Sequence, residues 1–176
     1  HLQFMNWTVD DNGAWDYAAD TRGYTVGGTL EYDDHAWSAR YGLFAMPVIA
    51  NGLSLDWAFS RAHGQNWEFE LRHSFIPGRK GATRILAYVN TAHMGNYREA
   101  VQHYLAGRTP HPDILSVERF GTNKYGFGWN NEQEITFNFR VATRFGWNDD
   151  HEESFAYTEV AQTALIAGDY YGTRWH

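Results

Sequence analysis

The chain has 176 residues, no cysteine, a formal net charge of −7 and an aromatic content of 17%. The absence of cysteine excludes a disulfide scaffold, a zinc–thiolate site and a cysteine nucleophile, and the acidic charge argues against a nucleic-acid-binding protein. Abundant aromatic residues together with a mean hydropathy of only −0.56 are typical of an outer-membrane β-barrel, which has aromatic girdles and a polar interior.

Alternation of apolar and polar side chains predicts β-strands along most of the chain. In chain order, we expect strands at residues 4–9, 22–33, 36–46, 67–75, 83–91, 124–129, 135–147 and 155–166. The alternation is clearest in residues 135–147. The regular runs are about 9–13 residues long, whereas ordinary strands have about 5–6 residues and membrane-spanning strands about 9–11. The strands therefore predict a transmembrane barrel, with a soluble β-sandwich or barrel as the alternative.

The connections between these strands alternate in length. Residues 33–35, 77–81 and 130–133 form short connections, whereas the connections at 10–21, 48–66 and 92–122 are long. Outer-membrane barrels have short periplasmic turns and longer external loops. We therefore predict that the short connections lie at the periplasmic rim and that the long ones lie at the opposite rim.

One long connection contains a predicted helix over residues 96–106. Asn96 can cap its N-terminus, Glu99 follows three residues later, and Gly107 is a natural stop. We expect the helix to pack at the rim of the barrel, and the alternative is that it constricts the mouth.

The charged residues of the strands alternate with the aromatic ones. This pattern predicts that one face lines a water-filled lumen through Arg40, Glu68, Glu70, Arg72, Arg140 and Arg144. The other face would meet lipid through Trp37, Tyr41, Phe69, Leu71, Phe137, Phe139 and Phe145. In the last strand we place Tyr157 and Glu159 toward the lumen, because a charge that faces lipid is costly. Ala156, Val160, Ala164 and Ile166 would then face lipid.

Several segments resemble the carbohydrate-selective porins of the OprB type. They include residues 16–24 (DYAADTRGY), 37–42 (WSARYG), 61–65 (RAHGQ), 90–100 (NTAHMGNYREA) and 145–149 (FGWND), and they occur in order over nearly the whole chain. The resemblance implies a sugar porin of the Gram-negative outer membrane, built as a barrel of about sixteen strands. This chain would supply about eight or nine strands and one short loop helix. We expect residues 1–176 to form a single unit that is truncated at both ends.

Other functions receive weaker support from the sequence. Glu68 and Glu70 lie on one strand face about 7 Å apart, but a glycosidase places its two carboxylates across a cleft, so no enzyme is expected. The nine histidines lack metal-ligand spacing, and residues 149–153 are interpreted as a solvated acidic loop. We expect no cofactor. The expected partners are sugars and outer-membrane lipid, with oligomerisation or a larger membrane assembly left open. The main alternative function is a soluble β-rich carbohydrate-binding module.

Overall fold

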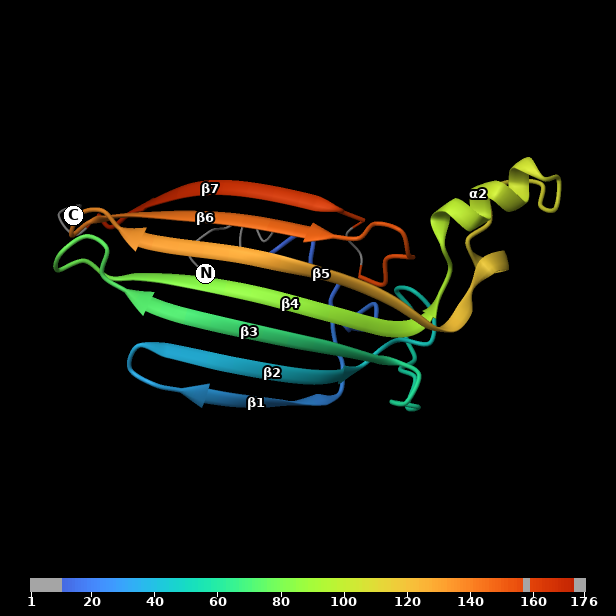
Figure 1. Cartoon of the computed structure of the whole chain (residues 1–176), viewed down its shortest axis with the longest axis horizontal. Helices are drawn as coiled ribbons and strands as arrows, with labels where there is room; N and C mark the ends of the chain where they lie inside the picture. The colour runs from blue at the N-terminus through green and yellow to red at the C-terminus, as the bar shows by residue number, and fades with distance from the viewer. Residues whose placement is uncertain (1–10, 157–158, 173–176) are drawn as a thin grey trace.

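The structure, a computed structural model, describes residues 11–156 and 159–172. Seven strands in this part of the chain form one antiparallel sheet in which each strand pairs with its neighbours in sequence (Figure 1). The strands are β1 (Gly27–Asp33), β2 (Trp37–Ala45), β3 (His63–His73), β4 (Gly81–Met94), β5 (Arg119–Glu134), β6 (Phe139–Asn148) and β7 (Gln162–Tyr170). Helix α2 (Tyr97–Leu105) and the 3₁₀ helix η1 (Leu115–Val117) lie between β4 and β5.

This architecture confirms the predicted all-β antiparallel fold. Each of the seven strands overlaps a predicted one, and the remaining predicted strand, residues 4–9, lies outside the described residues. Several strand boundaries differ from the predicted ones by four residues or more, and two of these differences change the connections or the site. The predicted turn at residues 130–133 lies within β5, and the turn follows at residues 135–138. The last strand begins at Gln162 rather than at Phe155.

The polar sequence of residues 130–133 explains the first of these errors. Asn131 resembles a turn residue, but its side-chain oxygen accepts a hydrogen bond of 2.8 Å from the hydroxyl of Thr83 on β4. Glu132 faces the opposite way and binds arginines of β4 and β6. Partners on neighbouring strands therefore extend β5 through a stretch whose local composition favours a turn.

The connections separate by length between the two ends of the sheet. Short turns join β1 to β2, β3 to β4 and β5 to β6 at one end, at the left of Figure 1, and the longer connections lie at the other end with α2. Residues 77–81 and α2 therefore lie at opposite ends, as predicted. Asn96 caps α2 by accepting a hydrogen bond of 3.1 Å from the backbone N–H of Glu99. The helix extends beyond the strand ends.

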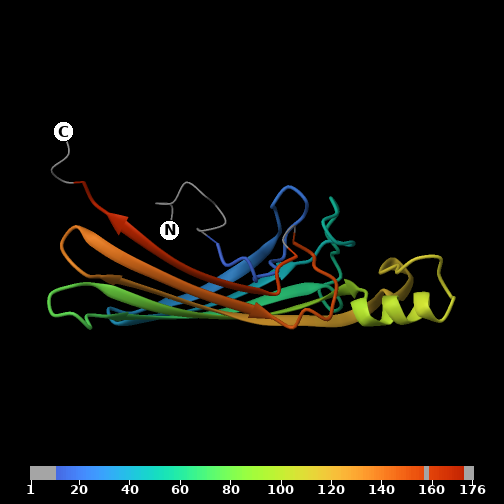
Figure 2. The ribbon, with the colours of Figure 1, turned by 90° about the horizontal axis from the view of Figure 1, so that it is seen from above.

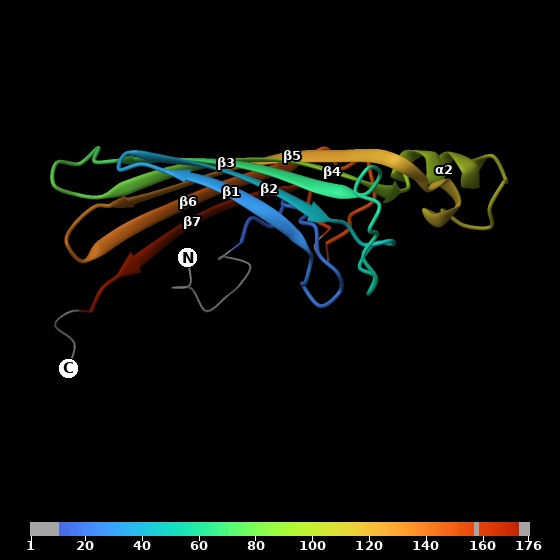
Figure 3. The same ribbon diagram turned by 90° about the horizontal axis from the view of Figure 1, so that it is seen from below.

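The sheet is curved, and residues 11–26, which precede β1, lie on its concave side (Figures 2 and 3). They cover the end of the sheet near the long connections. A small apolar core lies there, formed by Ala18, Met46, Ala62, Ala92, Met94 and Phe155. Within the described residues, no helix has the length and apolar character needed to cross a membrane.

Candidate functional site

The strand register gives the sheet two chemically different faces. Directly paired residues share a face, so Tyr41, Trp67 and Ala87 lie on one side, whereas their chain neighbours Arg40, Glu68 and Leu86 lie on the other. This parity continues across the sheet. The predicted charged residues that lie on strands therefore occupy one face, and the predicted aromatic residues that lie on strands occupy the other.

The convex face is apolar and exposed. Its exposed large side chains include Trp67, Phe69, Leu71, Ile85, Tyr125, Phe127, Trp129 and Phe145. Aromatic rings from neighbouring strands contact one another, as in the pairs Trp37–Phe69 and Phe127–Phe145, whose ring centroids lie 5.8 and 5.9 Å apart. An exposed aromatic face of this kind matches the lipid-facing wall of a β-barrel.

Phe137 departs from this pattern. It was predicted to face lipid from a strand, but it lies in the turn at residues 135–138, where it is exposed. The guanidinium of Arg79, from the neighbouring turn, lies 5.9 Å from the centroid of its ring.

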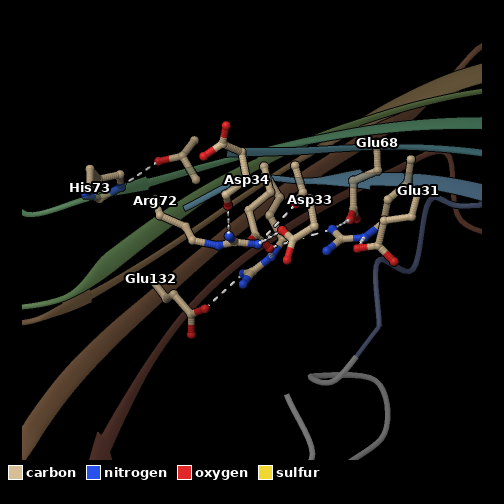
Figure 4. A network of polar contacts seen from close by, with 12 residues as sticks. Glu31, Asp33, Asp34, Glu68, Arg72, His73 and Glu132 are labelled. Carbon is tan, nitrogen blue, oxygen red and sulfur yellow. Dashed lines mark hydrogen bonds and ion pairs between the residues drawn. The ribbon is translucent and has the colours of Figure 1, made fainter. Parts of the chain in front are cut away.

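The concave face carries a network of alternating arginines and carboxylates, which we call the charge ladder (Figure 4). At its β1 side, Arg40 donates to Glu31 at 2.9 Å and to Glu68 at 2.6 Å. Arg72 bridges Asp33 and Glu70, at 2.5 and 2.8 Å. Arg40 on β2 thus links β1 to β3, and Arg72 on β3 also reaches β1.

Glu70 connects this half of the ladder to the other. Its carboxylate accepts a hydrogen bond of 2.6 Å from Arg84 on β4, which also donates to Glu132 on β5 at 2.9 Å. Arg140 on β6 then lies 3.3 Å from Glu132 and 3.1 Å from Asp169 on β7. The charge ladder therefore crosses all seven strands.

Residues 11–20, which we call the inner segment, lie against the concave face. The backbone carbonyl of Asp11 accepts a hydrogen bond of 2.6 Å from Arg144, and the indole N–H of Trp15 donates to Asn66 at 2.9 Å. Between the inner segment and the charge ladder lies a cavity of about 380 Å³. The residues that line it include Asp11, Asn12, Trp15, Arg40, Glu68, Glu70, Arg84 and Arg144.

The structure brings together most of the predicted lumen residues. The charge ladder contains Arg40, Glu68, Glu70, Arg72 and Arg140, whereas Arg144 lies on the same face and contacts the inner segment. Glu159 does not lie on a strand, because β7 begins only at Gln162, and its side chain is exposed in the preceding connection. Its predicted neighbour Tyr157 lies outside the described residues.

Two other residues of that predicted strand also need correction. Ala156 is buried, and its backbone N–H donates to Asp16, so it does not face lipid. Val160 precedes β7. Ala164 and Ile166 do lie on the convex face, since they pair with Phe145 and Thr143.

Sequence reasoning missed the inner segment and five members of the charge ladder, namely Glu31, Asp33, Arg84, Glu132 and Asp169. Glu31, Asp33 and Arg84 lie in predicted strands but were not selected. Glu132 was assigned to a turn, and Asp169 lay beyond the last predicted strand. Glu132 and Asp169 lie near Arg140 on the same face because of the register of β5, β6 and β7, and no signal in a single sequence reveals that register. The inner segment has no strand periodicity that could have revealed it.

The acidic connection after β6 differs from the solvated loop that was expected. Asp149 and Glu153 are buried. The Glu153 carboxylate accepts a hydrogen bond of 3.2 Å from the backbone N–H of Gly95. Burial, with the nearby carboxylates of Glu118 and Asp16, raises the pKa of Glu153 to about 7. The described residues contain no group of three or more histidine or acidic side chains placed to hold a metal ion.

Comparison with known proteins agrees with this arrangement. Residues 1–162 match the family described as carbohydrate-selective porin, OprB family. The sheet also resembles the structure of OprB from Pseudomonas putida determined at high pH, with a TM-score of 0.61 and 16% sequence identity. That match covers 82% of this chain but only 35% of the porin. No curated protein sequence matches significantly.

Such a match shows a shared fold and shows that the chain spans about a third of the porin's length. The family match includes most of the described strands, and it identifies the protein family, which a shared fold alone does not do. This chain, with an apolar outer wall and a charged concave face, belongs to the OprB family of carbohydrate-selective porins, which are channels of the bacterial outer membrane.

Proposed function

We propose that this chain forms part of the wall and the narrow region of a passive diffusion channel for sugars. In this proposal, the seven strands belong to a longer barrel, whose remaining strands pair with the free edges of β1 and β7. Support comes from the share of the Pseudomonas putida porin that the chain covers, 35%, and from the exposed apolar convex face. The solute gradient alone would drive transport, and no catalytic step or cofactor is needed.

The charge ladder is the observation that carries the proposal. A row of single-sign charges would select ions, but here each arginine lies beside one or more carboxylates. Sugars carry many hydroxyl groups, which donate hydrogen bonds to carboxylates and accept them from guanidinium groups. A sugar can therefore exchange its hydrogen bonds with one acid–arginine pair for hydrogen bonds with the neighbouring pair as it moves along the charge ladder. The low net charge of the paired groups suits a neutral solute.

Orientation follows from the lengths of the connections. We propose that the three short turns face the periplasm and that α2 faces the exterior, as in other outer-membrane barrels. Outer-membrane lipid would then surround the convex face. Labelling of a single cysteine introduced at Gly78 or at Leu105 in intact cells tests this orientation, because an impermeant reagent should reach only the second position.

The function is tested by sugar block of the ion current through the full-length porin in planar bilayers. Replacing Arg72, Arg140 and Arg144 together by alanine should weaken the block while the barrel still folds. The matched control removes three arginines from outside the strands, namely Arg79, Arg98 and Arg108. An unchanged sugar block and ion selectivity in the first variant would show that these three arginines are not the filter.

The proposal competes with a soluble carbohydrate-binding module, which the sequence alone left open. A porin should be recovered from membranes only with detergent. Folded, monomeric protein in a detergent-free fraction would contradict a channel. The structure does not favour the soluble module, because the exposed aromatic side chains of the convex face would then be in contact with water.

A further inference from the structure

We infer that Lys124 and Asp16 form a buried ion pair that sets the width of the channel by holding the inner segment on the concave face. Both are positioning residues, because neither lines the cavity. The inference rests on the proposed channel function but concerns conductance rather than the identity of the solute.

The ion pair joins three segments that are far apart in the sequence. The ammonium group of Lys124, on β5, lies 3.3 Å from the Asp16 carboxylate and donates to the hydroxyl of Ser154 at 2.7 Å. The Asp16 carboxylate also accepts hydrogen bonds from the backbone N–H groups of Phe155, at 3.0 Å, and Ala156, at 2.6 Å. The Lys124 and Asp16 side chains are only 1% and 2% exposed.

Other side chains of the sheet bind the backbone of the inner segment beside this pair. The carbonyl of Ala14 accepts hydrogen bonds of 3.0 Å from the Tyr88 hydroxyl and from the Asn148 amide. The Asn90 amide donates to the carbonyl of Asp16. These contacts are made by strands β4 and β6, so the inner segment is fixed from both sides of Lys124.

Glycines on β5 and β6 leave room for the inner segment. A Cβ atom at Gly128 would lie 2.4 Å from the Asn12 amide nitrogen, and one at Gly146 would lie 1.9 Å from the Asn12 amide oxygen. The inner segment therefore packs directly on the backbone of the sheet. Asn12 and Trp15 form one wall of the cavity, opposite the charge ladder.

Loss of either charged partner should loosen the inner segment. Removing Lys124 leaves the Asp16 carboxylate buried without its counter-ion, and removing the charge of Asp16 does the same to Lys124. Either side chain then gains by moving toward water, which the lumen supplies. Removing both charges eliminates this drive. If the ion pair holds the inner segment in this way, the double variant should behave more like the wild type than either single variant does.

The experiment records single channels of the full-length porin carrying Lys124→Met, Asp16→Asn or both. We expect each single variant to show higher conductance, more open-channel noise and weaker sugar block, with partial recovery in the double variant. Lys80→Met is the control, because it removes the chain's only other lysine, which is exposed in a turn. If Lys124→Met does not assemble, Asp16→Asn still tests the inference, because asparagine keeps the side-chain volume and one acceptor oxygen of Asp16.

A disulfide between the inner segment and the sheet distinguishes a loss of positioning of the inner segment from a general loss of structure. The chain has no cysteine, so Asn12→Cys with Gly146→Cys offers a single disulfide between the inner segment and β6. With Asp16→Asn, oxidation should bring the conductance to that of the oxidised cysteine pair with Asp16 intact, and reduction should abolish the recovery. Assembled single variants with wild-type conductance and noise would overturn the inference, as would a formed disulfide that restores neither. Absence of sugar block in the wild type would instead contradict the proposed function.

Discussion

Glu70 is the residue on which the charge ladder converges. Its carboxylate accepts hydrogen bonds from Arg72 and Arg84, and Arg40 lies 3.7 Å away. Strand parity was enough to predict from the sequence that Glu70 shares a face with Arg72. Its pairing with Arg84 depends on the register between β3 and β4, which a single sequence does not reveal.

Replacing Glu70 by glutamine should make the channel more selective for anions, because three arginines then share one carboxylate fewer. The variant should also lose about 1–3 kcal/mol of unfolding free energy, as charged hydrogen bonds are replaced by neutral ones. The reversal potential in a salt gradient measures the first effect. Glu31→Gln is the matched control, because Glu31 pairs only with Arg40 among the described residues. An equal shift in both variants would contradict the central role of Glu70.

Glu153 gives the connection after β6 a dependence on pH. Its pKa is raised from 4.5 to about 7, so folding favours the protonated form. The stabilisation is complete below about pH 4.5 and is lost as the pH rises through about 7. The groups that oppose its ionisation are Glu118, which contacts His93 at 3.2 Å, and Asp16.

Hydrogen-exchange protection of residues 149–156, corrected for the intrinsic rate, should therefore fall between about pH 5 and about pH 8. In Glu153→Gln the protection should stay constant over that range. A fall of equal size in the variant would assign the effect to another group.

At the scale of elements, alternation predicted which face each strand residue occupies but not where a strand ends. The run from Ile135 to Trp147 continues the alternation without interruption, yet β6 starts only at Phe139, because Ile135 donates its backbone N–H to Phe139 and closes the turn. The inner segment was missed for a different reason. Its position depends on side chains more than 50 residues away, such as Asn66, Tyr88 and Asn148, and no local pattern encodes such contacts.

Gly146→Ala tests how closely the inner segment approaches β6. The new methyl group would overlap Asn12, so the inner segment must move into the lumen or away from the sheet. We expect an altered single-channel conductance with the barrel still folded. Gly28→Ala, on β1, is the matched control, since its Cβ would have no neighbour within 4 Å in the part of the chain that the structure describes. Equal conductance in the two variants would show that the contact does not define the channel.

At the scale of the whole molecule, the two faces of the sheet define its environment. Phe69 points outward from the middle of β3, whereas Thr29 lies on the face of Glu31 and Arg40. An arginine at position 69 would enter the lipid, and near the bilayer midplane this costs roughly 2–4 kcal/mol.

We therefore expect Phe69→Arg to lower the unfolding free energy in lipid vesicles by about that amount, and Thr29→Arg to change it by less than about 1 kcal/mol. Urea titration followed by tryptophan fluorescence provides the measurement. Equal destabilisation by the two substitutions would contradict the assignment of the convex face to lipid.

The order of the strands has a consequence for how the channel is made. Each strand pairs with the one before it, so the wall can grow hairpin by hairpin through contacts that are close in sequence. The inner segment differs, because the contacts of Ala14 and Asp16 with Asn148, Phe155 and Ala156 span more than 130 residues. Such long loops close late. The nascent channel therefore passes through a wide state, and the narrow opening forms only after β6 is in place.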